Sequence, residues 1–191
     1  MRLIITGTPG TGKTTLAKKL GEALGFKAVN EREFALAEGI GEFDPENNEL
    51  VVPLEKLGTR LNKFLARNDN VIIEGHMLCE IRAKADSVVL LRVEPERLAA
   101  RLELRGYSDE KVQDNVFCEG IDYCRKHCLR NYPKAKIIEI ANNKSIKETL
   151  CETIVELRSK MKLKIKSGAG KKNAKRGLRR KMQKKAGKSK K

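Results

Sequence analysis

The sequence predicts an α/β protein whose parallel sheet of five strands is covered by helices on both faces. Short apolar runs alternate along the chain with longer segments in which apolar residues recur at helical spacing. The first apolar run ends in a glycine-rich loop, and this loop leads directly into a helical segment. Parallel strands need crossover connections, which we expect to be right-handed helices.

Five apolar runs define the expected strands. They cover residues 2–6, 26–29, 71–74, 87–93 and 136–140. The third run, Val71-Ile72-Ile73, ends on a carboxylate, Glu74. Such short continuous runs are typical of strands that are buried on both faces of a parallel sheet.

Helices are expected between these strands. The predicted helices end at Gly25, run from 54 to 65, begin at Pro95, extend from about 109 to about 130, and follow Ser145. Pro95 suits the first turn of a helix, and Ser145 with Glu148 three residues later resembles a capping box. Residues 30–53 have weaker periodicity and are predicted to form an inserted, mobile segment.

Positive charge is concentrated at the end of the chain. The last 34 residues, 158–191, contain 17 Lys or Arg and no Asp or Glu, whereas residues 1–157 carry 24 basic and 25 acidic residues. We therefore expect one globular domain over residues 1–166 and a disordered basic tail over 167–191. No apolar run approaches the length of a membrane span or a signal-peptide core, so we expect a cytoplasmic protein without membrane contact.

Residues 7–15 read GTPGTGKTT, and the first eight match the pattern G-x-x-x-x-G-K-[ST] in full. In such a P-loop, glycines let backbone N–H groups converge on a phosphate, which the helix dipole also favours. Lys13 is predicted to reach the β- and γ-phosphates of ATP, and the Thr14 hydroxyl to ligate Mg²⁺. The remaining predicted phosphate contacts are Gly10, Gly12 and Thr15. The motif indicates the three-layer fold of the P-loop NTPases.

A P-loop needs a carboxylate near the Mg²⁺, and Glu74 at its strand end is the candidate. Because Glu is one methylene longer than Asp, it could act through a metal-bound water or polarise an attacking water. His76 follows Gly75 and should face the phosphates from the same strand end. The alternatives are a capping carboxylate at the sheet edge and a solvent-exposed turn histidine.

Phosphoryl transfer also requires positive charge, which arginines supply. Arg97, Arg101 and Arg105 are spaced four apart and therefore share one helix face. Arg105 is the first candidate for phosphate contact because it begins the break where a lid would hinge. The alternative is a solvated stripe paired with nearby glutamates. Asn142 follows the last strand, where an adenine base would be held.

Three motifs together resemble the adenylate kinase isoenzyme 6 family, in an archaeal-type form. They are the N-terminal GTPGTGKTT, the triplet EGH at 74–76, and RGYSDEKVQDN at 105–115. The resemblance covers about residues 1–157. It implies a nucleoside monophosphate (NMP) kinase-like fold, with an NMP-binding segment at about 28–51 and a lid at about 104–114. It also implies that Glu74 and His76 take part in ATP hydrolysis.

The family resemblance implies an ATP- and Mg²⁺-dependent adenylate kinase and ATPase, with AMP and ADP as substrates. It further implies a role in maturation of the small ribosomal subunit, with a ribosomal protein of the S eleven type as partner. The chain departs from the family at Glu74, where Asp is common. It also has Leu36 near the position of an acceptor-gripping arginine, and Arg32 is displaced from that position.

Two other functions remain open from the sequence. One is a metabolic kinase for a nucleotide or another small hydroxyl acceptor. The other is a chaperone for RNA or a ribosomal protein that a nucleotide switches. The basic tail predicts sequence-tolerant, salt-sensitive binding of rRNA, because it has many cations and no aromatic side chains for stacking. A tail that serves solubility alone is the alternative.

Overall fold

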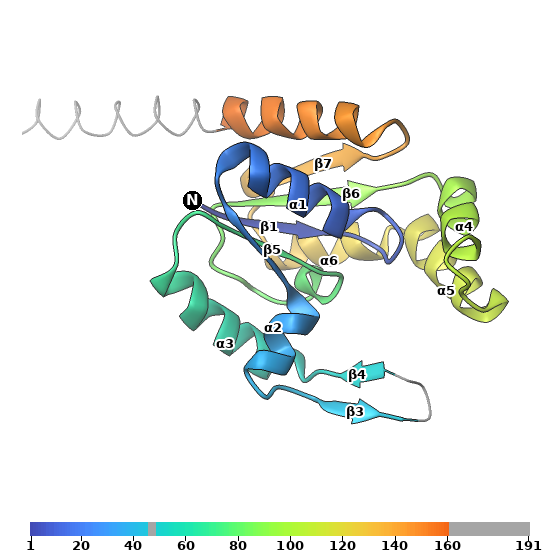
Figure 1. Cartoon of the computed structure of the whole chain (residues 1–191), viewed down its shortest axis with the longest axis horizontal. Coiled ribbons are helices and arrows are strands. Elements are labelled where there is room, and N and C mark those ends of the chain that lie inside the picture. The colour runs from blue at the N-terminus through green and yellow to red at the C-terminus, as the bar shows by residue number, and fades with distance from the viewer. Residues whose placement is uncertain (46–48, 161–191) are drawn as a thin grey trace, which may run out of the picture. The chain divides into compact units, whose positions relative to one another are not determined.

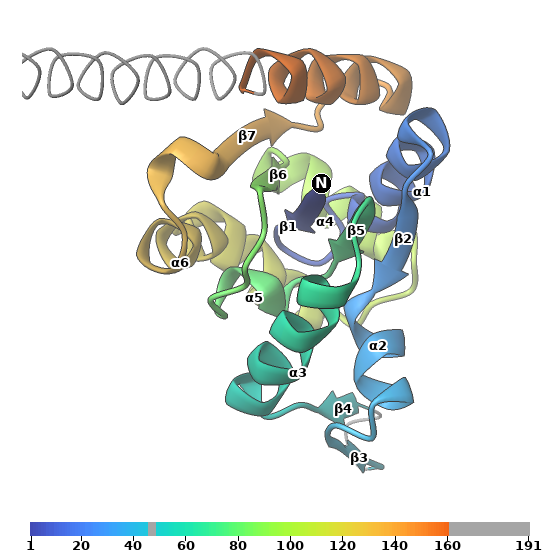
Figure 2. The ribbon, with the colours of Figure 1, turned by 90° about the vertical axis from the view of Figure 1, so that its left-hand side faces the viewer.

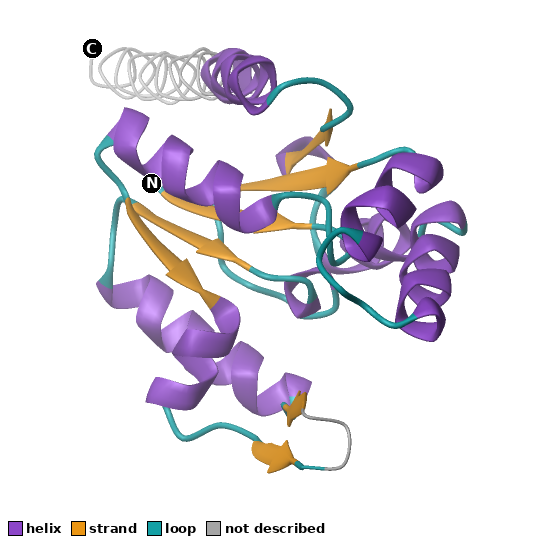
Figure 3. Cartoon of the chain, turned by 45° about the vertical axis from the view of Figure 1, so that its right-hand side comes forward, coloured by secondary structure: helices purple, strands orange, loops and turns teal. Residues whose placement is uncertain are grey.

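The structure is a computed structural model, and it describes residues 1–45 and 49–160. It confirms the predicted α/β class (Figures 1 and 3). The five predicted strands are β1 Arg2–Thr6, β2 Lys27–Asn30, β5 Val71–Glu74, β6 Ser87–Arg92 and β7 Ile137–Ala141. They pair in parallel in the order β2-β5-β1-β6-β7.

The strand register brings the carboxyl ends of β1, β5 and β2 to one edge. Ile5 is level with Glu74 across the β1–β5 pair, and Asn30 is level with Glu74 across the β2–β5 pair. The chain crosses from β1 to β2 on one side and later places β6 on the other side of β1. In open parallel sheets, ligands bind beyond the carboxyl ends of strands at such a reversal of strand order.

Helices cover both faces of the sheet, as Figure 2 shows. Helix α1 (Lys13–Leu24) lies on one face and buries Leu16, Ala17 and Leu20. Helices α3 (Leu54–Arg67) and α6 (Tyr123–Asn131) lie on the other face. Because strand side chains alternate between faces, Ile4, Ile73 and Val88 join α3 and α6 in one core while their neighbours face the opposite side.

The weakly periodic segment 30–53 contains a short helix and a hairpin. Helix α2 (Glu31–Ala37) is followed by the antiparallel strands β3 (Glu42–Asp44) and β4 (Glu49–Val51). The Asn30 side chain starts α2 by accepting hydrogen bonds from the backbone N–H groups of Arg32 and Glu33, at 2.9 and 3.2 Å. Phe34 fixes the helix by an edge-to-face contact with Phe64 of α3.

The predicted single helix over 109–130 is wrong, because the structure has two helices there. Helix α5 (Asp109–Gly120) ends before Asp122, which adopts a left-handed conformation with φ of 60°. The Arg92 guanidinium donates hydrogen bonds to the Glu119 carbonyl at 3.2 Å and to Asp122 Oδ1 at 2.6 Å. This distant arginine satisfies the groups at the break, and no local pattern announces it.

Two further helices follow their predicted starts. Helix α4 (Pro95–Glu103) has Pro95 in its first turn. A final helix runs over residues 146–160, of which 155–160 belong to a second compact unit. The capping box is present, since the backbone N–H of Glu148 donates to Ser145 Oγ at 3.3 Å and that of Ser145 to Glu148 Oε2 at 3.1 Å. The predicted domain end at 166 and the basic tail over 167–191 lie outside the described residues.

Candidate active site at the carboxyl edge of the sheet

A cavity of about 940 Å³ lies beyond the carboxyl ends of β1, β2 and β5. A second cavity, of about 360 Å³, shares four lining residues with it: Gly10, Gly12, Thr15 and Arg105. The predicted site residues Lys13, Thr14, Glu74 and His76 line the first cavity, and Asn142 lines the second. The fold therefore brings all the predicted site residues to the walls of these two adjoining cavities.

The P-loop conformation requires its glycines. Gly10 and Gly12 have φ of 90° and 95°, in the left-handed region that other residues rarely adopt. A side chain at Gly12 would also meet the amide nitrogen of Asn142, which donates a hydrogen bond to the Thr11 carbonyl at 2.8 Å. Because the side-chain Oδ1 of Asn142 accepts a hydrogen bond from the Thr149 hydroxyl, the Asn142 side chain is held in place between the P-loop and Thr149, and it lines the second cavity.

Thr8 holds the P-loop together through its backbone carbonyl. Its carbonyl accepts hydrogen bonds from Lys13 Nζ at 3.0 Å and from the Thr11 hydroxyl at 2.8 Å. Burial lowers the pKa of Lys13, while the nearby carboxylates of Glu31 and Glu74 oppose that change. The ammonium group is thus bonded to the loop backbone at 3.0 Å and lies on the cavity wall.

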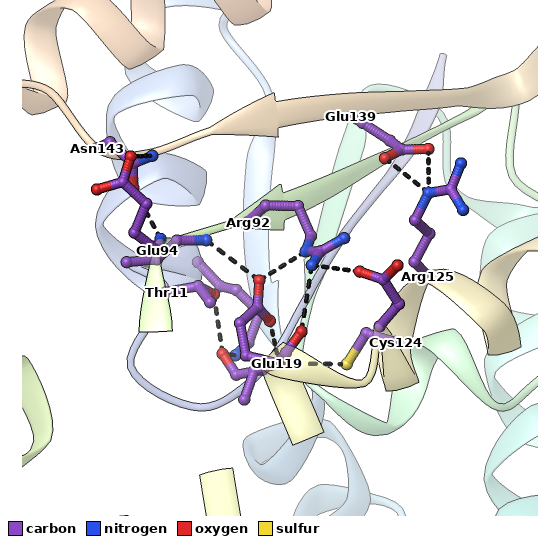
Figure 4. Close-up of polar contacts among 12 residues, drawn as sticks. Thr11, Arg92, Glu94, Glu119, Cys124, Arg125, Glu139 and Asn143 are labelled. Atoms are coloured by element: carbon purple, nitrogen blue, oxygen red, sulfur yellow. Dashed lines mark hydrogen bonds and ion pairs between the residues drawn. The ribbon is translucent and has the colours of Figure 1, made fainter. Parts of the chain in front are cut away.

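The side chain of Thr8 is in turn held by a buried ion pair between Arg92 and Glu119. The Thr8 hydroxyl donates to Glu119 Oε2 at 2.5 Å. The Arg92 Nε donates to Glu119 Oε1 at 2.6 Å, and Figure 4 shows these two side chains together. Glu119 is only 2% exposed, and its Oε1 also accepts from the backbone N–H of Val93. Glu119 could not be identified from the sequence, because its two side-chain partners lie 27 and 111 residues away.

Glu74 and Thr14 meet at the mouth of the P-loop. The Thr14 hydroxyl donates to Glu74 Oε1 at 2.9 Å, and the Asn30 amide donates to the same oxygen at 2.5 Å. One carboxylate and one hydroxyl on a cavity wall are hard oxygen donors of the kind that Mg²⁺ prefers alongside phosphate oxygens and water. The donor set therefore fits the predicted ion.

His76 lies beside a second buried carboxylate, Glu31. The Glu31 Oε1 atom accepts hydrogen bonds from the backbone N–H groups of His76 and Met77, at 2.8 and 3.1 Å, and lies 3.2 Å from His76 Nδ1. A side chain at Gly75 would overlap the Glu31 carboxyl group. His76 could be identified from the sequence but Glu31 could not, because the local sign of Glu31 is no more than an acid directly after a strand end.

The arginines separate into different roles by position. Arg105 is exposed and borders both cavities, whereas Arg101 donates to the Asn142 carbonyl at 2.8 Å and borders the second cavity. Arg97 pairs with Glu94 at 3.1 Å and lines neither cavity, as the solvated-stripe alternative predicts for this residue. Arg32, at the start of α2, lines the first cavity.

Neither residues 1–45 nor 49–160 contain a helix with the length and apolarity that membrane crossing requires.

Known proteins with similar sequences support a kinase-type site. The family model described as "AAA domain" matches residues 3–122. A protein from Pyrococcus furiosus named "Putative adenylate kinase" is 39% identical over 157 residues, covering 82% of this chain and 83% of that protein. The "Adenylate kinase isoenzyme 6 homolog" of Caenorhabditis elegans is 30% identical over 165 residues, covering 84% of this chain and 90% of that protein.

Two solved structures with a similar fold are named as kinases. A gluconokinase from Sinorhizobium meliloti 1021 superimposes with a TM-score of 0.58 and 16% identity, covering 87% of this chain and 97% of the other. A deoxyadenosine kinase from M. mycoides with bound dATP has a TM-score of 0.54 and 13% identity, covering 83% and 100%. At these identities the likeness shows the fold alone, whereas the sequence relatives show the family. The chain belongs to the AAA-domain family of P-loop proteins and, within it, to the adenylate kinases represented by these archaeal and nematode relatives.

Proposed function

We propose that this protein is an ATP-dependent, adenylate kinase-like enzyme that transfers the γ-phosphoryl group of ATP to AMP or to water. One observation carries the proposal. A single cavity collects the P-loop lysine, a Thr14–Glu74 pair at 2.9 Å, and His76 beside a buried carboxylate. These are the groups that phosphoryl transfer needs, because its catalysis is mostly positioning and charge stabilisation.

The P-loop is the proposed ATP-binding element. Its backbone N–H groups and the start of α1 would hold the phosphates, together with Lys13 and Thr15. Arg105 borders both cavities and is the proposed lid contact to ATP. The second cavity, with Asn142 in its wall, is the proposed binding place of the adenine base of ATP.

Thr14 and Glu74 are the proposed Mg²⁺ ligands. Asn30 would hold the Glu74 carboxylate in place by the hydrogen bond described above. When bound, Mg²⁺ neutralises charge that develops on the transferring phosphoryl group. The contribution of this chain is to present one hydroxyl and one carboxylate oxygen at the phosphate end of the cavity.

The acceptor side of the cavity is proposed to be the segment 28–51. Arg32 from α2 and Leu50 and Val52 from the hairpin region line it. Arg32 is the proposed contact to the phosphate of AMP, because it is a cavity-lining cation on this side. Leu36, in contrast, is 58% exposed and lies outside the cavity lining.

Comparing ATP consumption with and without acceptors tests the proposed function. We expect ADP formation from ATP alone and faster ADP formation when AMP is added. Other nucleoside monophosphates and small hydroxyl compounds form the comparison series, since a metabolic kinase would respond to one of these instead. Absence of ADP formation under every condition, with Mg²⁺ present, would contradict the proposal.

We also propose, from the motif resemblance, that the enzyme acts in small ribosomal subunit maturation with a ribosomal protein of the S eleven type. The basic residues 158–191 support an rRNA contact, because 17 Lys or Arg side chains in 34 residues carry enough positive charge to attract a polyanion such as RNA. Co-purification at low salt, followed by identification of the bound protein and RNA, tests the partner. Recovery of the enzyme with neither would contradict this role.

Deletion of residues 168–191 is expected to weaken RNA binding and flatten its salt dependence, because fewer counterions are then released on binding. ATP turnover should remain nearly unchanged. The measurement is RNA affinity at several salt concentrations for the full chain and the deletion. A chain of equal length whose tail Lys and Arg residues are replaced by Ser separates charge from length. Equal affinities at every salt concentration would reject the tail as an RNA contact.

A further inference from the structure

We propose that Glu31 is a positioning residue that fixes the His76 ring through Nδ1, so that Nε2 can serve as the base for attack by water. The inference deepens the proposed function and rests on it. It assigns a role to a carboxylate that neither the P-loop motif nor the EGH triplet contains. It also predicts that hydrolysis and transfer to AMP depend differently on this residue.

Glu31 is buried at a position where a carboxylate is costly. Its residue exposure is 3%, and burial of a carboxylate is favourable only when hydrogen bonds or charges compensate it. Oε1 receives the two backbone N–H groups of His76 and Met77 and lies within reach of the imidazole. The turn that carries His76 is therefore built around this one oxygen.

Gly75 makes this arrangement possible. The space that a side chain at Gly75 would fill is occupied by the Glu31 carboxyl group. The carboxylate consequently reaches the His76 ring from α2, across the end of β5. The contact joins the segment 28–51 on the proposed acceptor side to the turn that carries His76.

The second carboxylate oxygen distinguishes Glu31 from a purely structural acid. Oε2 is buried and has no hydrogen-bond partner in the described part of the chain. The Glu31 carboxylate interacts electrostatically with the Lys13 ammonium. The backbone contacts of Oε1 therefore do not account for the whole carboxylate, whose charge also acts on the P-loop lysine.

The ring contact defines which nitrogen of His76 is available. A neutral imidazole carries one proton, and a carboxylate 3.2 Å from Nδ1 favours the tautomer in which Nδ1–H donates to it. Nε2 is then the acceptor nitrogen. The His76 side chain is 53% exposed and lines the cavity, so the ring is accessible to water. Six other charged side chains line the same cavity: Lys13, Arg32, Glu74, Arg105, Lys111 and Asp114.

The proposed step is balanced for water. The water oxygen forms a bond to the γ-phosphorus as the bond from that phosphorus to the bridging oxygen breaks, and ADP leaves. Nε2 accepts the water proton, which later passes to solvent, and the Glu31 carboxylate stabilises the imidazolium that exists between these events. Transfer to AMP needs no such base, because its phosphate oxygen is already ionised.

Four variants test this role: E31Q, H76N, the double variant E31Q/H76N, and E33Q. Gln retains the shape of Glu31 and can still accept from the backbone, but it lacks the charge. We expect E31Q to lower kcat for hydrolysis about tenfold or more, with KM for ATP nearly unchanged. AMP-dependent transfer should fall much less. E33Q, an exposed acid on the same helix, should behave as the unmodified protein.

The double variant distinguishes positioning from general damage. If Glu31 acts through His76, E31Q has little further effect in the H76N background, so the two losses are strongly non-additive. Additive losses, equal losses of hydrolysis and transfer, or unchanged hydrolysis in E31Q would each overturn the proposal.

Nitrogen NMR of the unmodified protein provides a readout that requires neither catalysis nor a stable variant. The chain has only two histidines, so the His76 ring signals can be assigned by through-bond correlation to its backbone in isotopically labelled, unmodified protein. A protonated Nδ1 with an unprotonated Nε2 is expected, and the opposite tautomer would overturn the proposal even if every variant failed to fold. If the unmodified enzyme consumes no ATP, the proposed function fails, while the NMR result still decides whether Glu31 fixes the ring.

Discussion

Replacing Lys13 with Ala is expected to reduce ATP turnover by a factor of about 10³ or more, the upper range for loss of one charged transition-state contact. Lys13 Nζ lies on the cavity wall and donates a hydrogen bond to the Thr8 carbonyl at 3.0 Å. Lys13 is the one cationic residue within the predicted phosphate-binding loop, residues 7–15. Steady-state ADP formation, with and without AMP, measures the effect.

The fold should survive this substitution. Burial lowers the pKa of Lys13, which means that the charged form is held at a cost in the folded chain. The thermal midpoint of K13A should therefore differ little from that of the unmodified protein. Lys18, an exposed residue one turn further along α1, offers the matched control, since K18A removes a lysine that lies outside both cavities. A normal rate of ATP consumption in K13A would show that the nucleotide site has been assigned to the wrong loop.

Replacing Arg92 with Met is expected to lower the free energy of unfolding by about 3–5 kcal/mol. Arg92 donates at 2.6 Å to Glu119, whose side chain is 2% exposed, and at 2.6 Å to Asp122. Without the guanidinium, the Glu119 carboxylate stays buried with no opposite charge beside it. Urea unfolding followed by circular dichroism measures the loss.

Two further variants show whether the buried charge is the cause. R92M/E119Q removes both charges and should recover part of the loss, because the uncompensated carboxylate is then gone. R125M breaks the Arg125–Glu139 pair, whose side chains are each 40% exposed and 3.1 Å apart (Figure 4). This exposed pair should cost less than about 1 kcal/mol. If R92M and R125M lowered stability equally, the buried pair would have no special structural role.

Local sequence patterns are sufficient to predict the strands of the sheet and the part of the site formed by the P-loop, Glu74 and His76. All five strands were predicted to within one residue, because buried parallel strands are continuous apolar runs whose signal is local. The P-loop was predicted because its glycines and lysine are contiguous. Glu74 and His76 could be placed opposite it, because the carboxyl ends of neighbouring parallel strands meet at one edge.

Local patterns were insufficient wherever a distant partner shapes the backbone. Helix α2 has only seven residues, so its periodicity is too short to recognise, and its cap and its aromatic contact with Phe64 stabilise it. The break between α5 and α6 is determined by Arg92 at the end of β6. The apolar spacing of residues 109–130 looks like one continuous helix, because the spacing of residues along the chain carries no information about a contact with Arg92.

The amino-acid sequence by itself determined the succession of strands and helices along the chain, the phosphate-binding loop, and the acid and histidine opposite it, since each depends on neighbouring residues. Only the tertiary structure decided which buried carboxylates support these groups. Glu31 comes to His76 from 45 residues away, and Glu119 comes to Thr8 from 111 residues away. The physical reason is that a buried charge is stable only beside its partners, and the folded chain, not the local sequence, brings those partners together.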